Sequence, residues 1–250
     1  MFINQTIDKL HEMRLTGMAE ALTEQLNNPD HSELSFEERI AWLVDRHWSW
    51  RENRSLKRRL ANAKLRDREA SVEAIDFRRP RGLDRSEILS LATCQWVARH
   101  HNLIITGPCG VGKSFLACAL AQKAIRERYT GYYTRQPPLL RDLAMARADG
   151  SLDKRLGLLA RVDVLIIDDW MMTALGESER RDILEIVEDR YNTRSTILTS
   201  QIPIDQWHEQ IGDPTSADSI LDRLVHNAYR LELKGESMRK VKAAIDKDNE

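Results

Sequence analysis

The most constraining feature of this 250-residue sequence is a glycine-rich run that ends in lysine and serine. Residues 107–114 read GPCGVGKS, directly after the apolar run NLIIT and directly before the helix-like run FLACALAQKA. This is the G-x-x-x-x-G-K-[S/T] spacing of a phosphate-binding loop, in the strand-before and helix-after setting that such a loop requires. The glycines let backbone amides turn toward phosphate oxygens, and the helix directs its positive end at them. The run therefore predicts a nucleotide site, and the alternative is a fortuitous glycine-rich turn.

Each position of this loop has an expected contact. Lys113 is expected to reach the β and γ phosphates of ATP, and Ser114 is expected to bind Mg²⁺. The expected nucleotide contacts are Gly107, Pro108, Cys109, Gly110, Val111, Gly112, Lys113, Ser114 and Phe115.

A second apolar run ends in two adjacent carboxylates. Residues 163–170 read DVLIIDDW, so Asp168 and Asp169 follow a strand-like run that is apolar enough to be covered on both faces. Two negative charges at such a strand end are costly unless a cation is present. We therefore expect Asp168 to hold the metal ion through a water molecule, and Asp169 to orient or deprotonate the attacking water. The alternative is that the pair only caps the next helix.

Strand-like and helix-like segments alternate after residue 86. Helix-like stretches separate five short apolar or aromatic runs, at 102–106, 131–134, 162–167, 195–200 and 229–233. This rhythm predicts an α/β fold, a parallel sheet with helices on both faces. Residues 1 to about 76 have helical spacing, and DFRRPRGLDR (76–85) then interrupts it. We predict a helical domain over 1–70 and a nucleotide-binding domain over 71–250.

Three further polar side chains are candidates on weaker grounds. Gln201 follows the run ILTS, so it is expected near the metal site with Thr199 and Ser200, where it could hydrogen-bond the water or the γ phosphate. It is equally readily a polar residue that merely ends a strand. Arg223 and Arg239 are single arginines, and a lone arginine is usually a solvated surface residue.

Basic residues concentrate between residues 46 and 81, where twelve lysines and arginines oppose five acids. On a helix, several of them share a face that could follow a phosphate backbone. A second, smaller basic group precedes the acidic run. The candidate DNA contacts are Arg51, Arg54, Lys57, Arg58, Arg59, Lys154 and Arg155.

Less specific explanations exist for this basic stretch. Its charges could belong to an exposed helix face that pairs with acids of a neighbour. Trp48 and Trp50 suit core or subunit packing better than base stacking. Because nothing in the sequence resembles a base-reading helix, we expect phosphate contacts with little sequence specificity.

The composition argues against a secreted or membrane protein. Cys94, Cys109 and Cys118 lack metal-ligand spacing and suit a reduced compartment better than a disulfide framework. No apolar run approaches the length of a membrane span, and the first residues lack the apolar core of a signal peptide. We therefore expect a cytoplasmic protein without a membrane partner.

Four segments together resemble the IstB-like ATPases, which are helper proteins of bacterial two-gene insertion sequences. These ATPases are related to DnaC-type helicase loaders within the AAA+ class. The resemblance covers nearly the whole chain, and its last segment is the most specific. The segments are DFRRPRGLDR, GPCGVGKS, VLIIDDW and the block from Ile197 to Lys240.

The resemblance implies more than the residues alone. It implies an AAA+ P-loop core after a small all-helical domain, ATP hydrolysis with Mg²⁺, and multimers that form a ring or spiral on duplex DNA. It also implies cooperation with a transposase encoded by the same element, to select and prepare target DNA. By position, Gln201 matches the first sensor residue, Arg223 the arginine supplied to a neighbouring subunit's nucleotide, and Arg239 the second sensor arginine.

This sequence departs from the AAA+ pattern in two places. Asp169 stands where many AAA+ proteins carry glutamate, so slow hydrolysis or a different water position is expected. The sequence ends within about 20 residues of its last strand-like run, so we expect no C-terminal lid domain. The alternatives are a DnaC-like loader that grips a replicative helicase with its N-terminal region, and a scaffold that binds ATP with negligible turnover.

Overall fold

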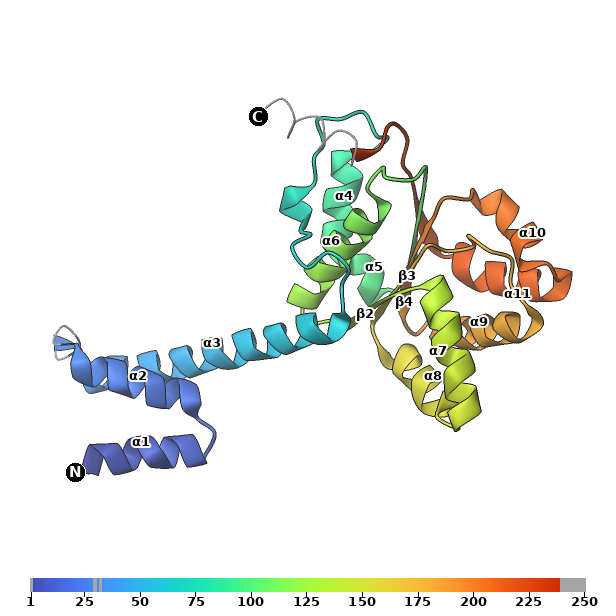
Figure 1. The fold of residues 1–250 in the computed structure, drawn as a ribbon. Coiled ribbons are helices and arrows are strands. Elements are labelled where there is room, and N and C mark those ends of the chain that lie inside the picture. The colour runs from blue at the N-terminus through green and yellow to red at the C-terminus, as the bar shows by residue number, and fades with distance from the viewer. Residues whose placement is uncertain (1, 29–30, 32, 239–250) are drawn as a thin grey trace, which may run out of the picture. The chain divides into compact units, whose positions relative to one another are not determined.

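The computed structural model describes residues 2–28, 31 and 33–238 (Figure 1). The chain divides into two compact units, Met1–Arg58 and Arg59–Glu250. The boundary therefore lies twelve residues before the predicted one at residue 70. Residues 59–70 belong to the second unit because they pack there: Ala63, Leu65 and Ala70 are buried. The sequence places no turn at this boundary, since a single helix continues across it.

The first unit is helical in its described residues. It contains α1 (Phe2–Glu12), α2 (Thr16–Asn27) and most of α3 (Phe36–Ala63). A reciprocal capping pair begins α3, because the Ser35 hydroxyl accepts from the Glu38 amide and the Glu38 carboxylate accepts from the Ser35 amide. Close contact between α2 and α3 requires glycine at position 17, where a Cβ would lie 2.7 Å from the Cβ of Trp50. Helices therefore precede the sheet, as the sequence predicted.

The second unit is built on a parallel sheet of five strands in the described residues. The spatial order is β2-β3-β4-β1-β5, which places β1 between β4 and the edge strand β5. The strands are β1 (Asn102–Thr106), β2 (Gly131–Arg135), β3 (Val164–Asp168), β4 (Ser195–Ser200) and β5 (Ala228–Glu232). Because β3 and β4 are buried along their whole length, both faces of the sheet are covered.

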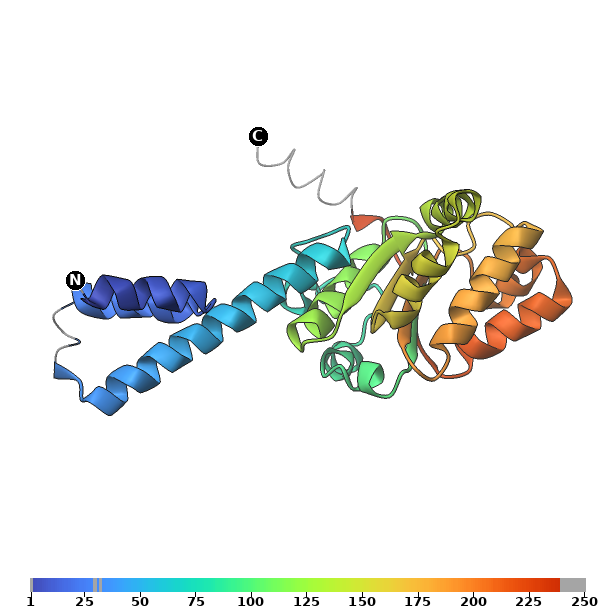
Figure 2. The same ribbon diagram turned by 90° about the horizontal axis from the view of Figure 1, so that it is seen from below.

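Helices lie on both sides of this sheet (Figures 1 and 2). Figure 1 shows α4, α5 and α6 on one side and α7 to α11 on the other. The helices and 3₁₀ turns are η2 (Val72–Ala74), α4 (Arg85–Ala92), α5 (Gln95–Ala98), α6 (Lys113–Arg126), α7 (Gln136–Asp149), α8 (Leu152–Arg161), α9 (Glu177–Arg190), η3 (Ile204–Gln206), α10 (Trp207–Ile211) and α11 (Pro214–Val225). The predicted fold, a parallel sheet flanked by helices, is confirmed. None of the described helices is long and apolar enough to cross a membrane.

The described chain after β5 contains no helical domain and ends at Met238. Its backbone instead runs along neighbouring loops: Leu233 donates to the Thr106 carbonyl (2.8 Å), and Lys234 donates to the Arg81 carbonyl (2.9 Å). Arg239, the candidate second sensor, lies outside the described residues.

A buried arginine ties together the amino ends of the central strands. Arg190, 2% exposed, donates to the carbonyls of Leu159 (2.5 Å) and Val162 (2.8 Å). It also donates to the Ser195 carbonyl and the Thr196 hydroxyl. Burial lowers the pKa of Arg190 to about 9, which is still above neutral, so the guanidinium stays charged. One side chain thus joins α8 to the starts of β3 and β4.

Replacing Arg190 with methionine should lower the free energy of unfolding by about 3 kcal/mol, because buried carbonyl groups would lose their donor. Urea unfolding followed by circular dichroism measures this change. Arg181→Met is the matched control on the same helix, where an exposed i,i+4 pair with Glu177 predicts a change below about 0.5 kcal/mol. Equal effects of the two substitutions would contradict the role given to Arg190.

Candidate nucleotide-binding site

The glycine-rich loop turns between the end of β1 and the start of α6, as the sequence predicted. Gly107 and Gly110 have φ angles of 144° and 81°, a region that side chains with a Cβ rarely adopt. A Cβ on Gly107 would lie 2.3 Å from the Leu233 carbonyl oxygen, and one on Gly110 would lie 2.2 Å from the Ser237 hydroxyl. The segment after β5 therefore packs on the loop so closely that only glycine fits.

Lys113 lies inside this loop at the first position of α6. Its Nζ donates to the carbonyls of Gly107 (2.7 Å) and Pro108 (2.8 Å), and the side chain is 8% exposed. Burial lowers the pKa of Lys113, while the charges of Asp168 and Asp169 oppose that change. A cation fixed here by backbone carbonyls is placed to meet phosphate oxygens beside the positive end of α6.

Asp168 is the centre of the polar contacts at the carboxyl edge of the sheet. Its side chain is 1% exposed, and four side chains donate to it. Oδ1 accepts from the hydroxyls of Ser114 (3.0 Å) and Thr199, and Oδ2 accepts from Tyr133 (2.5 Å) and Arg66 (3.3 Å). Burial alone would raise the pKa of Asp168, but these hydrogen bonds outweigh it and hold the pKa below its usual range.

The oxygen atoms at this point fit a magnesium ion. Ser114 Oγ and Asp168 Oδ1 are 3.0 Å apart, and neighbouring ligands of an octahedral Mg²⁺ at 2.0–2.1 Å stand about 3 Å apart. Mg²⁺ prefers oxygen, and it typically takes only one or two protein ligands beside phosphates and water. The hydroxyl and the ionised carboxylate are therefore a suitable donor set next to a loop shaped for phosphate. Their spacing fits direct coordination by Asp168, for which the sequence predicted contact through a water molecule.

Asp169 differs from its neighbour in both backbone and charge. Its φ is 58°, in the left-handed region that Asp and Asn enter more readily than most residues. Burial raises the pKa of the half-buried Asp169, and the charge of Asp168 raises it further, whereas Arg135, Arg66 and Lys113 lower it. A carboxylate with a raised pKa at a nucleotide site suits a general base.

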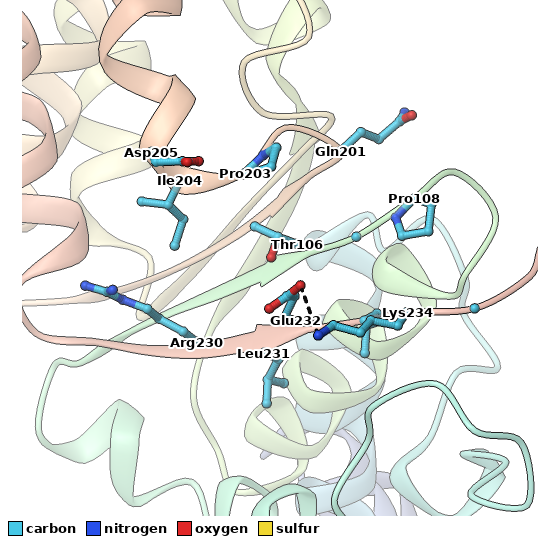
Figure 3. A pocket seen from close by; sticks show the side chains of 13 residues that line it. Thr106, Pro108, Gln201, Pro203, Ile204, Asp205, Arg230, Leu231, Glu232 and Lys234 are labelled. Carbon is cyan, nitrogen blue, oxygen red and sulfur yellow. Dashed lines mark ion pairs between the residues drawn. The ribbon is translucent and has the colours of Figure 1, made fainter.

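Gln201 does not contact Asp168 in the structure. Its amide lies 3.5 Å from the sulfur of Met172, and Thr199, two residues earlier on β4, supplies the hydroxyl that donates to Asp168. Figure 3 shows Gln201 extending away from Thr106 at the rim of a cavity of about 690 Å³. That cavity is lined by Gly107 and Pro108 but by neither Lys113 nor Asp168. The sensor role of Gln201 stays a prediction.

Arg223 lies at the opposite edge of the sheet from the phosphate loop. It pairs with Glu188 and donates to the Ser219 carbonyl (2.9 Å), and its own carbonyl accepts from the Asn102 amide (3.1 Å). Asn102 begins β1, whereas the loop follows its last residue, so the strand separates the two by about 13 Å. Arg223 is therefore remote from the nucleotide site of its own chain.

The family model described as IstB-like ATP binding protein matches residues 8–244. The chain belongs to the IstB-like ATP-binding family. Its relatives include y4pL of Sinorhizobium fredii, named as an insertion sequence ATP-binding protein, which is 50% identical over 96% of this chain and 98% of its own. Another, from Pseudomonas fluorescens, is named as an ATP-binding protein of insertion sequence IS1162 and is 48% identical over 81% of this chain and 88% of its own.

Solved structures share the fold of this IstB-like chain. DnaI covers 66% of this chain and 92% of its own with a TM-score of 0.57, and the DnaC helicase loader covers 66% and 97% with a TM-score of 0.53. The replication initiator DnaA, solved with AMPPCP and single-stranded DNA, aligns over 74% of this chain and 57% of its own with a TM-score of 0.59. At identities of 24%, 22% and 16%, these similarities concern the fold alone, which is that of a P-loop AAA+ core.

Sequence reasoning about the IstB-like site missed three side chains. Arg66 and Tyr133 donate to Asp168, and Arg81 supports the phosphate loop from outside by donating to the Val111 carbonyl at 3.0 Å. Tyr133 could have been predicted, because it is a polar side chain near the end of the strand-like run 131–134, which precedes the acidic run in the sequence. No sequence pattern identifies Arg66 or Arg81 as site residues, because both lie in irregular segments. Only the folded chain brings these segments to the site.

The candidate DNA contacts differ in exposure and in whether their charged groups contact other groups of the chain. Arg51, Lys57 and Arg58 are exposed on α3, and Arg54 is exposed over the ring of Trp50 (5.1 Å). Trp48 is 60% exposed.

The remaining basic candidates belong to the second unit. Arg59 donates to the Ile125 carbonyl, and Lys154 is exposed. Arg155 pairs with Asp142 at 2.7 Å and donates to the Tyr132 hydroxyl. Internal pairing favours a structural role for Arg155, and DNA contact stays a prediction for the whole set.

The substitution Asp169→Asn tests the general base without changing shape or backbone preference. ATP turnover should fall about 100-fold or more, because the amide cannot accept a proton, while nucleotide affinity stays within about twofold, because the side chain keeps its shape. Steady-state hydrolysis and binding of a fluorescent ADP measure the two effects.

The pH profile provides a second readout for Asp169. Because its pKa is raised above the ordinary 3.8, wild-type turnover should decline on acidification at a higher pH than an unperturbed aspartate would allow. An unchanged turnover in Asp169→Asn would remove Asp169 from the chemistry.

Proposed function

We propose that this IstB-like protein is an ATP-dependent, DNA-binding helper of transposition. It multimerises on duplex DNA, remodels target DNA and presents it to a transposase encoded by the same element, while ATP hydrolysis controls the assembly. The observation that carries the enzymatic part is the 3.0 Å contact of Ser114 with Asp168 beside the phosphate loop. The names of the relatives support the insertion-sequence context. Such a helper would act on cellular DNA in the cytoplasm.

Hydrolysis follows from the residues around the loop. Backbone amides of 107–114 and Lys113 bind the phosphates, and Ser114 and Asp168 hold the metal. Mg²⁺ held by Ser114 and Asp168 would neutralise charge on the phosphate oxygens. Asp169 orients the attacking water and accepts its proton. Cys109 and Phe115 are proposed as further nucleotide contacts of this loop.

Arg223 acts in trans in this proposal. Its position at the amino edge of the sheet is remote from its own site, so a second copy must supply the arginine that completes each nucleotide site. Such an arginine contributes roughly 10³- to 10⁵-fold to phosphoryl-transfer rate. Hydrolysis therefore depends on assembly into a ring or spiral, with Gln201 and Arg239 as proposed sensors.

Sedimentation on long duplex DNA tests the function directly. With ATP the protein should form large assemblies, and with ADP or no nucleotide it should not. Arg223→Ala should keep ATP-dependent assembly but slow disassembly at least tenfold, because nucleotide is no longer hydrolysed between subunits.

Mixing inactive variants isolates the trans contribution. Lys113→Ala and Arg223→Ala should each be inactive alone, and a mixture of the two should recover part of the ATP turnover. Assembly that requires single-stranded DNA or a hexameric helicase would instead point to a DnaC-like loader. Nucleotide binding without turnover under every condition would leave an ATP-gated scaffold.

The exposed basic face of α3 should dominate the salt dependence of DNA binding. Each phosphate contact contributes about −0.9 to the slope of log K against log salt. Replacing Arg51, Arg54, Lys57 and Arg58 with glutamine should therefore flatten the slope by roughly 3 to 4. Fluorescence anisotropy on a labelled duplex at several salt concentrations measures it.

The matched control for the α3 variant removes basic charge elsewhere. Lys154→Gln with Arg155→Gln should change the slope by less, because Arg155 is already paired with Asp142. An unchanged slope in the α3 variant would assign its arginines to contacts other than DNA.

A further inference from the structure

Arg66 joins the metal-binding carboxylate to a segment that is far from the phosphate loop in sequence. Its Nη1 lies 3.3 Å from Asp168 Oδ2, and its side chain is 44% exposed whereas that of Asp168 is 1% exposed. Tyr133 donates to the same oxygen, which leaves Oδ1 to Ser114 and Thr199. One oxygen of the carboxylate thus faces the metal position, and the other faces Arg66.

The segment that carries Arg66 is anchored by the three residues directly before it. Lys64, with a φ of 51°, ends α3 in the left-handed conformation, and its ammonium lies 5.7 Å from the centre of the Tyr132 ring. Leu65 is buried, and so is Ala63, whose Cβ lies 3.6 Å from where a Cβ of Gly131 would be. The last turn of α3 is therefore held against the start of β2, and Arg66 reaches from there to the end of β3.

Metal loading changes the electrostatics of this contact. A Mg²⁺ ion on Ser114 and Asp168 Oδ1 would share its carboxylate with the Arg66 guanidinium, and the two cations repel one another. Arg66 is nearly half exposed, so it can leave the carboxylate for solvent at little desolvation cost. The buried Tyr133 hydroxyl remains as a neutral donor to Oδ2.

We propose that Arg66 is a positioning residue that couples occupancy of the magnesium–nucleotide site to the segment 59–70 at the end of α3. The Arg66–Asp168 pair is closed without Mg²⁺–nucleotide and opens when it binds. This inference rests on the proposed function, because it requires that Ser114 and Asp168 take up Mg²⁺ with a nucleotide. The segment 59–70 would therefore respond to nucleotide binding, although it is not part of the phosphate loop.

Hydrogen exchange and nucleotide binding test the coupling together. In the full-length wild-type protein, amide exchange within residues 59–70 should rise about two- to fivefold on addition of Mg²⁺ and ADP, the range expected for loss of one partly exposed ion pair. Arg66→Ala should show the raised exchange without nucleotide and no further rise. The Mg²⁺ concentration that half-saturates binding of fluorescent ADP should also fall about two- to fivefold in this variant.

Two variants control the measurement. Arg68→Ala removes an exposed arginine two positions away and should behave as wild type in both readouts. Arg66→Lys keeps the charge and should stay closer to wild type than Arg66→Ala in both readouts. If Arg66→Ala does not fold, Arg66→Lys is used in its place.

The outcomes separate this inference from the function it rests on. If Arg66→Ala and Arg66→Lys match wild type in exchange and in Mg²⁺ dependence, the coupling is wrong while the nucleotide site stands. A higher Mg²⁺ requirement in Arg66→Ala would also overturn it, since Arg66 would then assist metal loading. If wild type binds fluorescent ADP no better than Lys113→Ala does, the nucleotide site itself is wrong.

Discussion

The buried carboxylate of Asp168 is the group on which the rest of this site depends. Placing a charge at the end of a strand that is covered on both faces is tolerable only because donors surround it, and those donors come from four separate segments. Ser114 lies at the start of α6, Thr199 near the end of β4, Tyr133 in the middle of β2, and Arg66 in the segment after α3. The requirement to satisfy one anion therefore fixes how several elements meet at the carboxyl edge.

The two edges of the sheet are specialised in opposite ways. At the amino edge, Arg190 is almost fully buried, and it donates to backbone carbonyls and to the Thr196 hydroxyl, so its contacts hold the fold together. At the carboxyl edge, Lys113 and Ser114 are held by contacts that a phosphate and a metal ion could replace. Arg223 lies at that same amino edge, so the role proposed for it requires a second copy of the chain.

Sequence patterns predicted the parts of the site that are formed by neighbouring residues of the chain. The glycine spacing defines a loop whose backbone must turn in one way, and the apolar run before Asp168 can end only at a sheet edge. Thr199 and Gln201 show the limit: side chains two positions apart share a face of a strand, so the pattern does not separate them. What separates them is the end of β4 at Ser200, which no pattern in the sequence marks. Arg66 lies 102 residues from its partner, in a segment without periodicity, and the helix that precedes it carries no mark of the unit boundary.

The edge strand β5 affects how copies of the chain can pair with one another. An open strand edge can pair with a strand of another molecule, which leads to aggregation. Here the charged side chains of Arg230 and Glu232 are exposed on β5, and the chain beyond it is bonded to Arg81. Backbone pairing between copies through β5 is thus discouraged, so the multimer proposed above would have to form through side-chain contacts.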